Sequence, residues 1–356
     1  MAQLEKSYTE NVQKSLYEVE QSEEGMRLDQ FAQQYFQTFS REQIKKKILS
    51  GEIFIHKRPG KIKSSTKLFC KEIVEVVIIK SSHEDEYWWG EKLLIEVAPK
   101  IIFEDHDLLV IEKPPFMSTH PAGKHIFYCA TVYFEKFHQK TIHSIHRLDR
   151  ETSGVLLLAK NPQVANLMTE QFEQSNVKKC YFFISKITEQ FKNIDEFTAN
   201  EKLGNPGTGR DRVIVNAYDT DSFDGKTALT YFKIIYKENG YALGLAFPQT
   251  GRQHQIRVHA MTHGLPLIGD KLYLGGYPLF QRFKDNQATL DDHELVELPR
   301  HALHSMGLKI PYQNQISHFI GTLPEDIKGW IKNKLSLNIE DLENEVREKI
   351  LQYFET

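Results

Sequence analysis

The stretch from His146 to Ala159, HRLDRETSGVLLLA, places two arginines around one carboxylate and then becomes apolar. Its apolar part, Val155 to Ala159, is short, begins with a β-branched residue and follows Gly154. Such a run is typical of a buried strand. We therefore predict that the polar residues before Gly154 form a loop held at the end of that strand. By composition alone, a carboxylate such as Asp149 in this loop is most often a turn residue or a surface ion pair.

The nine residues from His146 to Gly154 resemble the active-site motif of the RluA-type pseudouridine synthases, which isomerise uridine in RNA. The resemblance implies that Asp149 is the essential catalytic residue. It also implies the family's α+β fold, a mixed, mainly antiparallel sheet with flanking helices and a cleft across it. Lys113-Pro114, at the end of an expected strand, is similar to the family's entry motif.

A second block, TGRQHQIRVH at residues 250–259, resembles another motif of this family and departs from it at Gln253, where Thr is frequent. The resemblance implies that Arg257 pairs with the catalytic Asp. From the residues, the spacing of Thr250 and Gln253 is that of a capping box. We therefore predict a helix that begins at Thr250, carries Arg252 and His254 in its first turn, and has Arg257 on the same side as His254.

The family also has an active-site Tyr after a basic residue, which implies a catalytic role for Tyr181 after Lys178-Lys179. Phe182 is the alternative if the register of this strand is shifted. An ordinary core aromatic at this position remains a second interpretation of Tyr181.

Uridine isomerisation breaks the bond from base N1 to ribose C1′, turns the base and rejoins it through C5. No atom is gained or lost, so we expect no cofactor. A carboxylate can serve as nucleophile or as proton acceptor, and both roles remain open for Asp149. In a dry pocket it needs a fixed cation to stay ionised, which suits Arg257. Tyr181 can stack on the uracil.

A uridine in folded RNA must be flipped out, and Arg147 or Arg150 can fill the vacated place or bind phosphate. The full set of residues expected to contact RNA consists of Arg147, Arg150, Thr152, Arg252 and His254 near the site, and Arg27, Arg41, Lys45, Lys46 and Lys47 in the N-terminal part.

The whole chain of 356 residues carries a net charge of −3, yet its charges are unevenly distributed. Residues 25–80 contain twelve basic and five acidic residues, a local excess of seven positive charges. A polyphosphate partner needs such a local field. An exposed basic face on an ordinary helical unit is the other interpretation.

The same segment is similar to the small RNA-binding module shared by some ribosomal proteins, tyrosyl-tRNA synthetases and many pseudouridine synthases. Helical spacing from Leu28 to Phe36, a capping box at Ser40 with Gly51 at the helix end, and strands near 53–56 and 73–79 predict its elements. The residues that carry the resemblance are Arg27, Leu28, Asp29, Ser40, Arg41, Ile48, Gly51 and Ile53. It departs at Cys70-Lys71-Glu72, where the module usually has a Gly-Asp pair.

We expect five regions along the chain. They are a loose lead-in at 1–24, the basic α/β module at 25–80, a linker at 81–98, the catalytic domain at 99–325 and an acidic helical extension at 326–356. Within them we expect a surface insertion at 276–299, a flexible loop at Gly204 to Gly209, and a domain interface that receives Trp88-Trp89. Further expected elements are a strand pair at 101–113, a helix from Asn161-Pro162, a hairpin turning at Asn239-Gly240, and a helix at 335–354.

Other classes of protein fit less well. The three cysteines form no Cys-x-x-Cys pair, and we find neither a secretory signal nor an apolar run long enough for a membrane span. The pairs His143/His146 and His254/His259 lack a carboxylate or thiolate at a metal-site spacing, so we expect no metal. Ser153 does not lie in a Gly-x-Ser-x-Gly turn, so the sequence gives no support for a serine nucleophile.

The sequence thus predicts a cytoplasmic RNA pseudouridine synthase, a monomer with no obligatory protein partner. Its expected substrate is structured RNA, with rRNA favoured over tRNA. A non-catalytic RNA-binding protein on the same fold and a metal-dependent nucleic-acid hydrolase are the alternatives.

Overall fold

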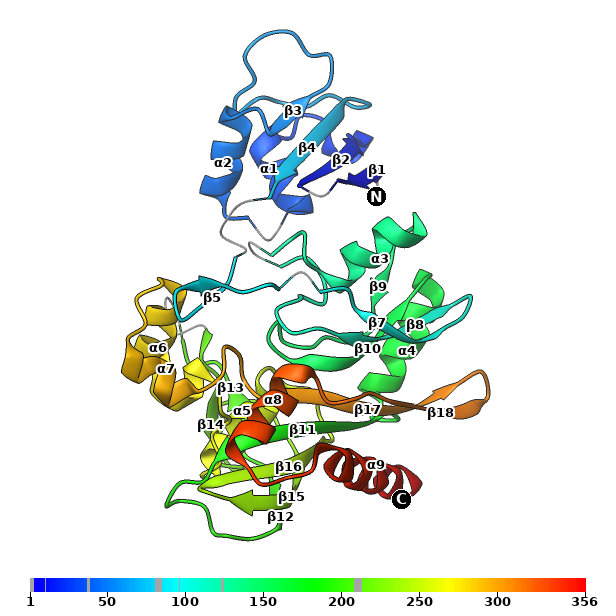
Figure 1. The fold of residues 1–356 in the computed structure, drawn as a ribbon. Helices are drawn as coiled ribbons and strands as arrows, with labels where there is room; N and C mark the ends of the chain where they lie inside the picture. Colours follow the sequence, from blue (N-terminus) through cyan, green and yellow to red (C-terminus); the bar gives the residue numbers. More distant parts are fainter. Residues whose placement is uncertain are drawn as a thin grey trace. The chain divides into compact units, whose positions relative to one another are not determined.

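A computed structural model describes residues 3–9, 11–36, 39–80, 85–95, 97–122, 125–207 and 213–356 of the chain (Figure 1). Its contacts divide the chain into two compact units. The smaller unit comprises Met1–Asp85 and His120–Thr141, and the larger comprises Glu86–Thr119 and Ile142–Thr356. Each unit contains a hydrophobic core of its own.

In the smaller unit, helices pack on a four-stranded antiparallel sheet of order β1-β2-β4-β3. The strands are β1 (Gln3–Tyr8), β2 (Val12–Glu18), β3 (Ile53–Ile55) and β4 (Ile73–Ile79), and the helices that pack on them are α1 (Leu28–Tyr35) and α2 (Arg41–Leu49). A 3-10 turn (Gln21–Glu23) and α3 (Ala130–His138) also belong to this unit. The predicted helices and strands of residues 25–80 are confirmed. Ser40 caps α2 in a reciprocal capping box with Gln43, as the spacing predicts.

The prediction of a loose lead-in at residues 1–24 is wrong for the residues that the structure describes. Strand β2 pairs with β4 along its whole length, and Tyr17 and Val19 are buried. The other side chains on the buried face of β2 are polar, namely Gln13 and Ser15. A strand whose buried face carries polar residues shows no hydrophobic alternation, so periodicity does not reveal it.

The turn before β4 also has an unusual residue. Lys71, within the triplet that replaces the module's Gly-Asp pair, adopts a left-handed φ of 67°. A side chain in this conformation costs roughly 1–2 kcal/mol. The chain therefore makes the turn before β4 without the glycine that the resemblance predicts.

The larger unit is built on a ten-stranded sheet, counted over the described residues. Its main path runs β12 (Glu196–Ala199), β15 (Thr230–Glu238), β16 (Tyr241–Pro248), β11 (Lys178–Lys186), β17 (Leu303–Tyr312), β10 (Ser153–Ala159), β8 (Leu108–Lys113) and β7 (Lys100–Glu104), with β18 (Gln315–Ile320) on β17 and β9 (His143–Ser144) on β10. Only β10 and β17 run parallel among the described strands. The predicted α+β class with a mixed, mainly antiparallel sheet is confirmed.

Six helices and two small hairpins complete the described part of this unit. They are α4 (Pro162–Glu173), α5 (Gln255–Thr262), α6 (Lys271–Lys284), α7 (Leu290–Val296), α8 (Glu325–Lys334) and α9 (Ile339–Glu355), with the pairs β5 (Tyr87–Trp88)/β6 (Glu91–Lys92) and β13 (Lys202–Gly204)/β14 (Asn216–Tyr218). As predicted, α4 begins at Pro162, and Asn239-Gly240, both with positive φ, turns the β15–β16 hairpin. The side chain of Asn161 caps α4. The predicted loop at Gly204 to Gly209 lies partly outside the described residues.

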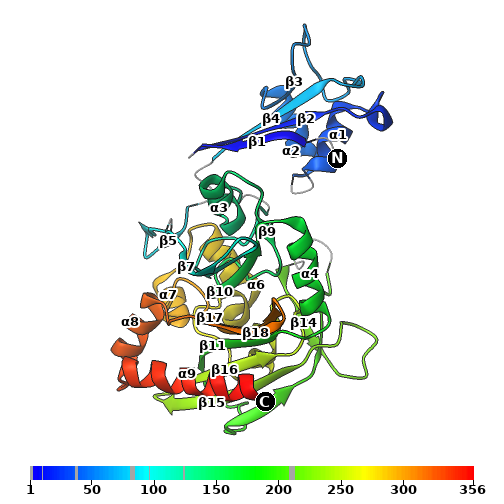
Figure 2. The ribbon, with the colours of Figure 1, turned by 90° about the vertical axis from the view of Figure 1, so that its right-hand side faces the viewer.

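Helices α8 and α9 cover one face of β11 and β16 (Figures 1 and 2). The predicted helix at 335–354 is confirmed as α9. Its residues Leu342, Val346, Ile350 and Phe354 are buried in the same cluster as Phe182 of β11. Residues 326–356 are therefore part of the core of the larger unit and do not form a separate extension.

The segment 276–299 is mostly helical, within α6 and α7. Trp88 stacks on Phe283 and Trp89 stacks on His293, with ring centroids 6.0 and 4.3 Å apart. The adjacent tryptophans thus dock on the insertion within the larger unit, where the sequence suggested a domain interface.

Strand β10 is entirely buried between β8 and β17, as its apolar sequence predicts. At its start, Gly154 has a φ of +108°, and a Cβ there would lie 2.1 Å from the carbonyl oxygen of Ser305. Only glycine allows the two parallel strands to approach this closely. The loop from Arg147 to Thr152 is fixed by this junction.

No helix in the described parts of the chain has both the length and the apolar composition of a membrane span.

We predict that Gly154→Ala destabilises the protein by about 3 kcal/mol or more, because it adds backbone strain to overpacking against β17. Urea unfolding measures the loss. Gly329→Ala in α8 is the control, since a Cβ there meets nothing within 4 Å and alanine should stabilise the helix by about 0.5–1 kcal/mol. A Gly154→Ala protein as stable as the wild type would contradict the close approach.

Candidate active site

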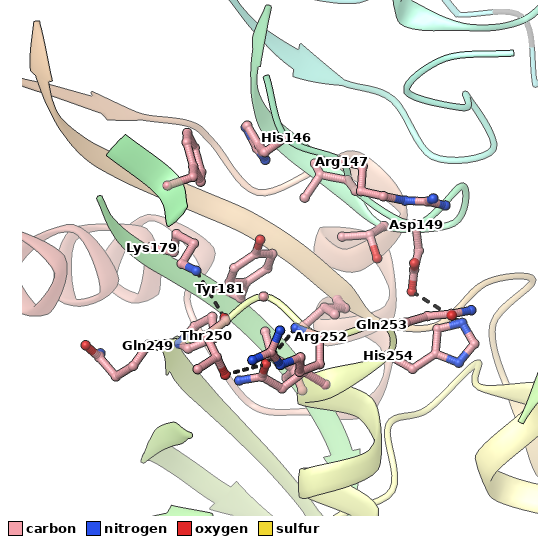
Figure 3. A pocket seen from close by; sticks show the side chains of 18 of the residues that line it. His146, Arg147, Asp149, Lys179, Tyr181, Gln249, Thr250, Arg252, Gln253 and His254 are labelled. Atoms are coloured by element: carbon pink, nitrogen blue, oxygen red, sulfur yellow. Dashed lines mark hydrogen bonds and ion pairs between the residues drawn. The ribbon is translucent and has the colours of Figure 1, made fainter. Parts of the chain in front are cut away.

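A pocket of about 670 Å³ opens in the larger unit where β11, the loop before β10 and the segment between β16 and α5 meet (Figure 3). Asp149 and His254 lie on one side of it, Lys179 and Gln249 on the other, and Tyr181 between them. The predicted residues that line the pocket are Asp149, Tyr181, Arg257, Arg147, Thr152, Arg252 and His254.

The helix of the second block begins five residues later than predicted, because Thr250 is not its cap. Helix α5 starts at Gln255, after His254 with a left-handed φ of 54°. The Thr250 hydroxyl donates to Oε1 of Gln255 (2.7 Å) and accepts from the backbone N–H of Leu229 (3.0 Å). A contact with Leu229, the residue before β15, thus replaces the local cap. Arg252 and His254 consequently lie on a loop at the pocket and not on the helix.

Arg257 is buried between two carboxylates. Its Nε and Nη2 donate to the two oxygens of Asp270, at 2.6 and 2.9 Å, and its Nη1 donates to Oδ2 of Asp149 at 3.1 Å. Burial alone lowers the pKa of a guanidinium, but Asp270 and Asp149 outweigh it and raise the pKa of Arg257. The pairing of Arg257 with Asp149 is the one that the resemblance implies.

The Asp149 carboxyl is strongly acidic. Burial raises its pKa, but His254, Arg257 and His301 outweigh burial and bring the pKa of Asp149 to about 2. Burial lowers the pKa of His254 to about 4, so its imidazole is neutral at pH 7. Arg257 is therefore the lasting positive charge that keeps Asp149 ionised.

Oδ2 of Asp149 takes the contact with Arg257 and faces Nε2 of His254 at 3.8 Å. Oδ1 of Asp149 has no hydrogen-bond partner among the described residues, and the side chain is about a quarter exposed toward the pocket. One carboxylate oxygen is held and the other is free to meet a ligand.

Tyr181 reaches the pocket because side chains alternate along β11. Cys180 and Phe182 point into the core beneath α8 and α9, whereas Tyr181 lines the pocket. The alternative assignment to Phe182 is thereby excluded on geometry. Burial, and secondarily the Asp149 charge, raise the pKa of Tyr181, so its hydroxyl stays protonated at neutral pH.

Two predicted residues of the central motif, Arg150 and Thr152, have partners within the protein. Arg150 does not line the pocket. It pairs with Glu86 at 2.7 Å and lies over the ring of Phe116. Thr152 is buried, and its hydroxyl bonds to Nε2 of His301 at 2.7 Å, so its contacts are those of a structural residue.

Backbone contacts also support the loop. The buried Nζ of Lys113, the lysine of the expected entry motif, donates to the carbonyl oxygens of Met117 (2.7 Å) and Arg150 (3.2 Å). Ser153 bonds to His304 on the neighbouring strand β17. The loop that carries Asp149 is therefore anchored on both sides.

In the smaller unit, the predicted RNA-contacting residues differ in their solvent exposure and in their ion pairs. Nε and Nη2 of Arg27 donate to the two carboxylate oxygens of the buried Asp29, and Lys47 pairs with Glu52. Arg41, Lys45 and Lys46 of α2 are exposed, although Arg41 lies 3.7 Å from Asp29 and Lys46 lies 3.6 Å from Glu42. These three are the members of the set that solvent, and hence a phosphate, can reach most easily.

Three residues in or beside the pocket were not singled out from the sequence. Asp270 is the N-cap of α6 and belongs to neither of the two motif blocks. Tyr273 shares a hydrogen bond with Nδ1 of His254 (2.9 Å), and its ring lies against the guanidinium of Arg257. Lys179 lines the far side, and burial lowers its pKa to about 8. The basic pair that includes Lys179 was the only signal for it.

The histidine pairs considered as metal ligands have other partners. Nε2 of His146 accepts the backbone N–H of Leu157 at 3.0 Å, and Nδ1 of His259 bonds to Thr230 at 2.9 Å. The described residues contain no group of three or more His, Cys, Asp or Glu side chains placed to hold a metal ion.

Comparison with known proteins shows the family of this chain. Residues 107–262 match the family model described as RNA pseudouridylate synthase. An uncharacterised RNA pseudouridine synthase of Zymomonas mobilis is 36% identical over 183 residues, which cover 50% of this chain and 79% of that protein. The ribosomal large subunit pseudouridine synthase C of Buchnera aphidicola is 29% identical over 301 residues, or 80% of this chain and 85% of that protein.

Among solved structures, the human RNA pseudouridylate synthase domain containing 4 superimposes with a TM-score of 0.52 at 21% identity, covering 65% of this chain and 92% of that one. This likeness shows the fold. The chain belongs to the RNA pseudouridylate synthase family. It is an enzyme that isomerises uridine to pseudouridine, and the predicted family is confirmed.

Proposed function

We propose that this enzyme converts specific uridines of ribosomal RNA to pseudouridine, with Asp149 as its essential residue. The observation that carries the proposal is the Asp149 carboxylate, ionised by Arg257 and with Oδ1 free in a pocket. Relatives such as those of Buchnera aphidicola and Pseudomonas aeruginosa are named ribosomal large subunit pseudouridine synthases, which favours rRNA over tRNA. The expected cytoplasmic location follows from that substrate.

In this mechanism the uridine leaves its helix and its base enters the pocket beside Tyr181. Oδ1 of Asp149 attacks the ribose or accepts a proton while the N1–C1′ bond breaks. The uracil turns over Tyr181 and C5 bonds to C1′, while Asp149 leaves C1′ or returns its proton to the ribose. The proton lost from C5 is balanced by one gained at N1. Arg257 keeps the carboxylate ionised before the first step and stabilises it again when it is released. Because the product is an isomer of the substrate, the reaction requires no redox or phosphate donor.

RNA binding involves two regions in this proposal. At the pocket, Arg147 is exposed and can enter the space left by the flipped base, with Arg252 and His254 beside it. Arg150, held by Glu86, is less suited to this task. The basic smaller unit, with exposed Arg41, Lys45 and Lys46, supplies phosphate contacts elsewhere on the RNA. The enzyme acts as a monomer without an obligatory protein partner.

Asp149→Asn should abolish turnover, because the amide keeps the size of the side chain and removes its charge. The wild type and the variant are incubated with ribosomal RNA from a strain lacking the enzyme, with a chelator present, and pseudouridine is mapped by sequencing. We expect one or a few new sites with the wild type, none with the variant, and similar RNA affinity for both.

A wild-type protein that binds rRNA tightly and modifies no uridine would contradict this substrate. Modification of tRNA alone would replace rRNA by the other substrate considered from the sequence. RNA cleavage that the chelator stops would indicate a metal-dependent hydrolase.

Changing Lys45, Lys46 and Lys47 together to Glu should weaken RNA binding and reduce its salt dependence. The slope of log affinity against log salt falls by about one unit for each phosphate that the protein no longer neutralises. Filter binding at several salt concentrations measures both. The matched control changes Lys192, Lys332 and Lys334, which are exposed and do not line the pocket. Equal effects of the two triple variants would show that net charge alone matters.

A further inference from the structure

We propose that Asp270 is a positioning residue that limits Arg257 to a single contact with Asp149 and so leaves Oδ1 of Asp149 free to react. This inference rests on the proposed role of Asp149. It assigns a task to a buried carboxylate that neither touches the expected position of the substrate nor was predicted from the sequence.

A guanidinium can bind a carboxylate bidentately along either of two edges. In this site Asp270 occupies the Nε/Nη2 edge with both of its oxygens. This bidentate contact fixes the orientation of the guanidinium, and in that orientation only Nη1 contacts Asp149. Without Asp270, Arg257 could turn its Nη1/Nη2 edge to Asp149 and occupy both oxygens of the reacting group.

The number of contacts that Arg257 makes with Asp149 affects the reactivity of this carboxylate. A carboxylate whose two oxygens both accept from a guanidinium is more strongly stabilised as an anion and is a weaker base and nucleophile. One contact is enough to keep Asp149 charged, whereas two would also block its reacting atom. Sharing one cation between two carboxylates meets both requirements.

The backbone holds Asp270 rigidly in this place. Its Oδ1 also accepts from the N–H groups of Leu272 and Tyr273, which makes it the N-cap of α6. The preceding Gly269 has a φ of +78°, and a Cβ there would lie 1.7 Å from the carbonyl oxygen of Arg300. Asp270 is therefore fixed from both sides and is fully buried.

Asp270→Asn separates the positioning task from the capping task. The amide oxygen can keep the cap and the contact with Nη2, while the amide NH₂ would face Nε of Arg257, donor against donor. Arg257 is thus released without loss of the helix cap. We expect the single-turnover rate to fall about 10- to 100-fold, as for a small misplacement at a reacting centre. RNA affinity should stay within about twofold, because Asp270 does not reach the RNA.

Asp292→Asn is the matched control. Asp292 also accepts two bonds from one arginine, Arg282, and also takes part in a helix cap, because it accepts from the backbone N–H of Thr289, the N-cap of α7. It does not line the pocket. Its replacement should leave the single-turnover rate within about twofold of the wild type. Equal rate losses in the Asp270→Asn and Asp292→Asn variants would overturn the proposal, because the effect would then be a general loss of structure.

A double-mutant cycle with Arg257→Lys tests whether Asp270 acts through Arg257. A lysine ammonium has no planar pair of donors for Asp270 to orient. In the Arg257→Lys background, Asp270→Asn should therefore lower the single-turnover rate by a further factor of only about two or less. Rate losses that multiply in the double variant would refute the proposal. An inactive wild type would instead refute the proposed function and is distinguished at once from either result.

Discussion

A single buried cation shared by two carboxylates holds the active site together. Removing Arg257 from water is costly, and a single buried partner often repays that cost poorly. The bidentate contact with Asp270 and the single contact with Asp149 together satisfy the guanidinium. Three separate segments, the loop before β10, helix α5 and the start of α6, meet at this one residue.

The sheet determines where these segments end. The close approach of β10 and β17 at Gly154 fixes the loop that carries Asp149, and Lys113 ties the same loop to the end of β8. The alternation along β11 sends Tyr181 to the pocket and its neighbours into the core beneath α8 and α9. Residues 335–354 therefore support the site from behind, through the strand that presents Tyr181.

Local signals allowed much of this fold to be predicted from the sequence. The cap at Ser40, the turn at Asn239-Gly240 and the apolar strand after Gly154 depend on nearest neighbours, and each lies where the sequence placed it. The predicted helix start at Thr250 was wrong because that hydroxyl accepts from the backbone of Leu229, outside the helix. Strand β2 was missed because its buried face is polar and its partner, β4, lies about sixty residues further along the chain.

The residues of the candidate site likewise divide into those that a sequence motif identifies and those that only long-range contacts bring in. Asp149, Tyr181 and Arg257 could be named because their motifs resemble those of a known family. The second partner of Arg257 and the pairing of Arg150 with Glu86 could not, since each is a contact between segments whose spacing carries no motif. Burial and long-range pairing decide the geometry around the motif residues.

The pH dependence of single-turnover isomerisation by Arg257→Lys, at saturating enzyme and compared with the wild type, tests the central claim most directly. Activity requires ionised Asp149, so it is lost as pH falls through the pKa of that carboxyl. Lysine lacks the planar guanidinium and stabilises the Asp149 carboxylate less. Burial should therefore raise the pKa of Asp149 from about 2 and move the acid limb of the profile to higher pH. A rate that falls at every pH, with the limb unmoved, would mean that Arg257 serves RNA binding and does not keep Asp149 ionised.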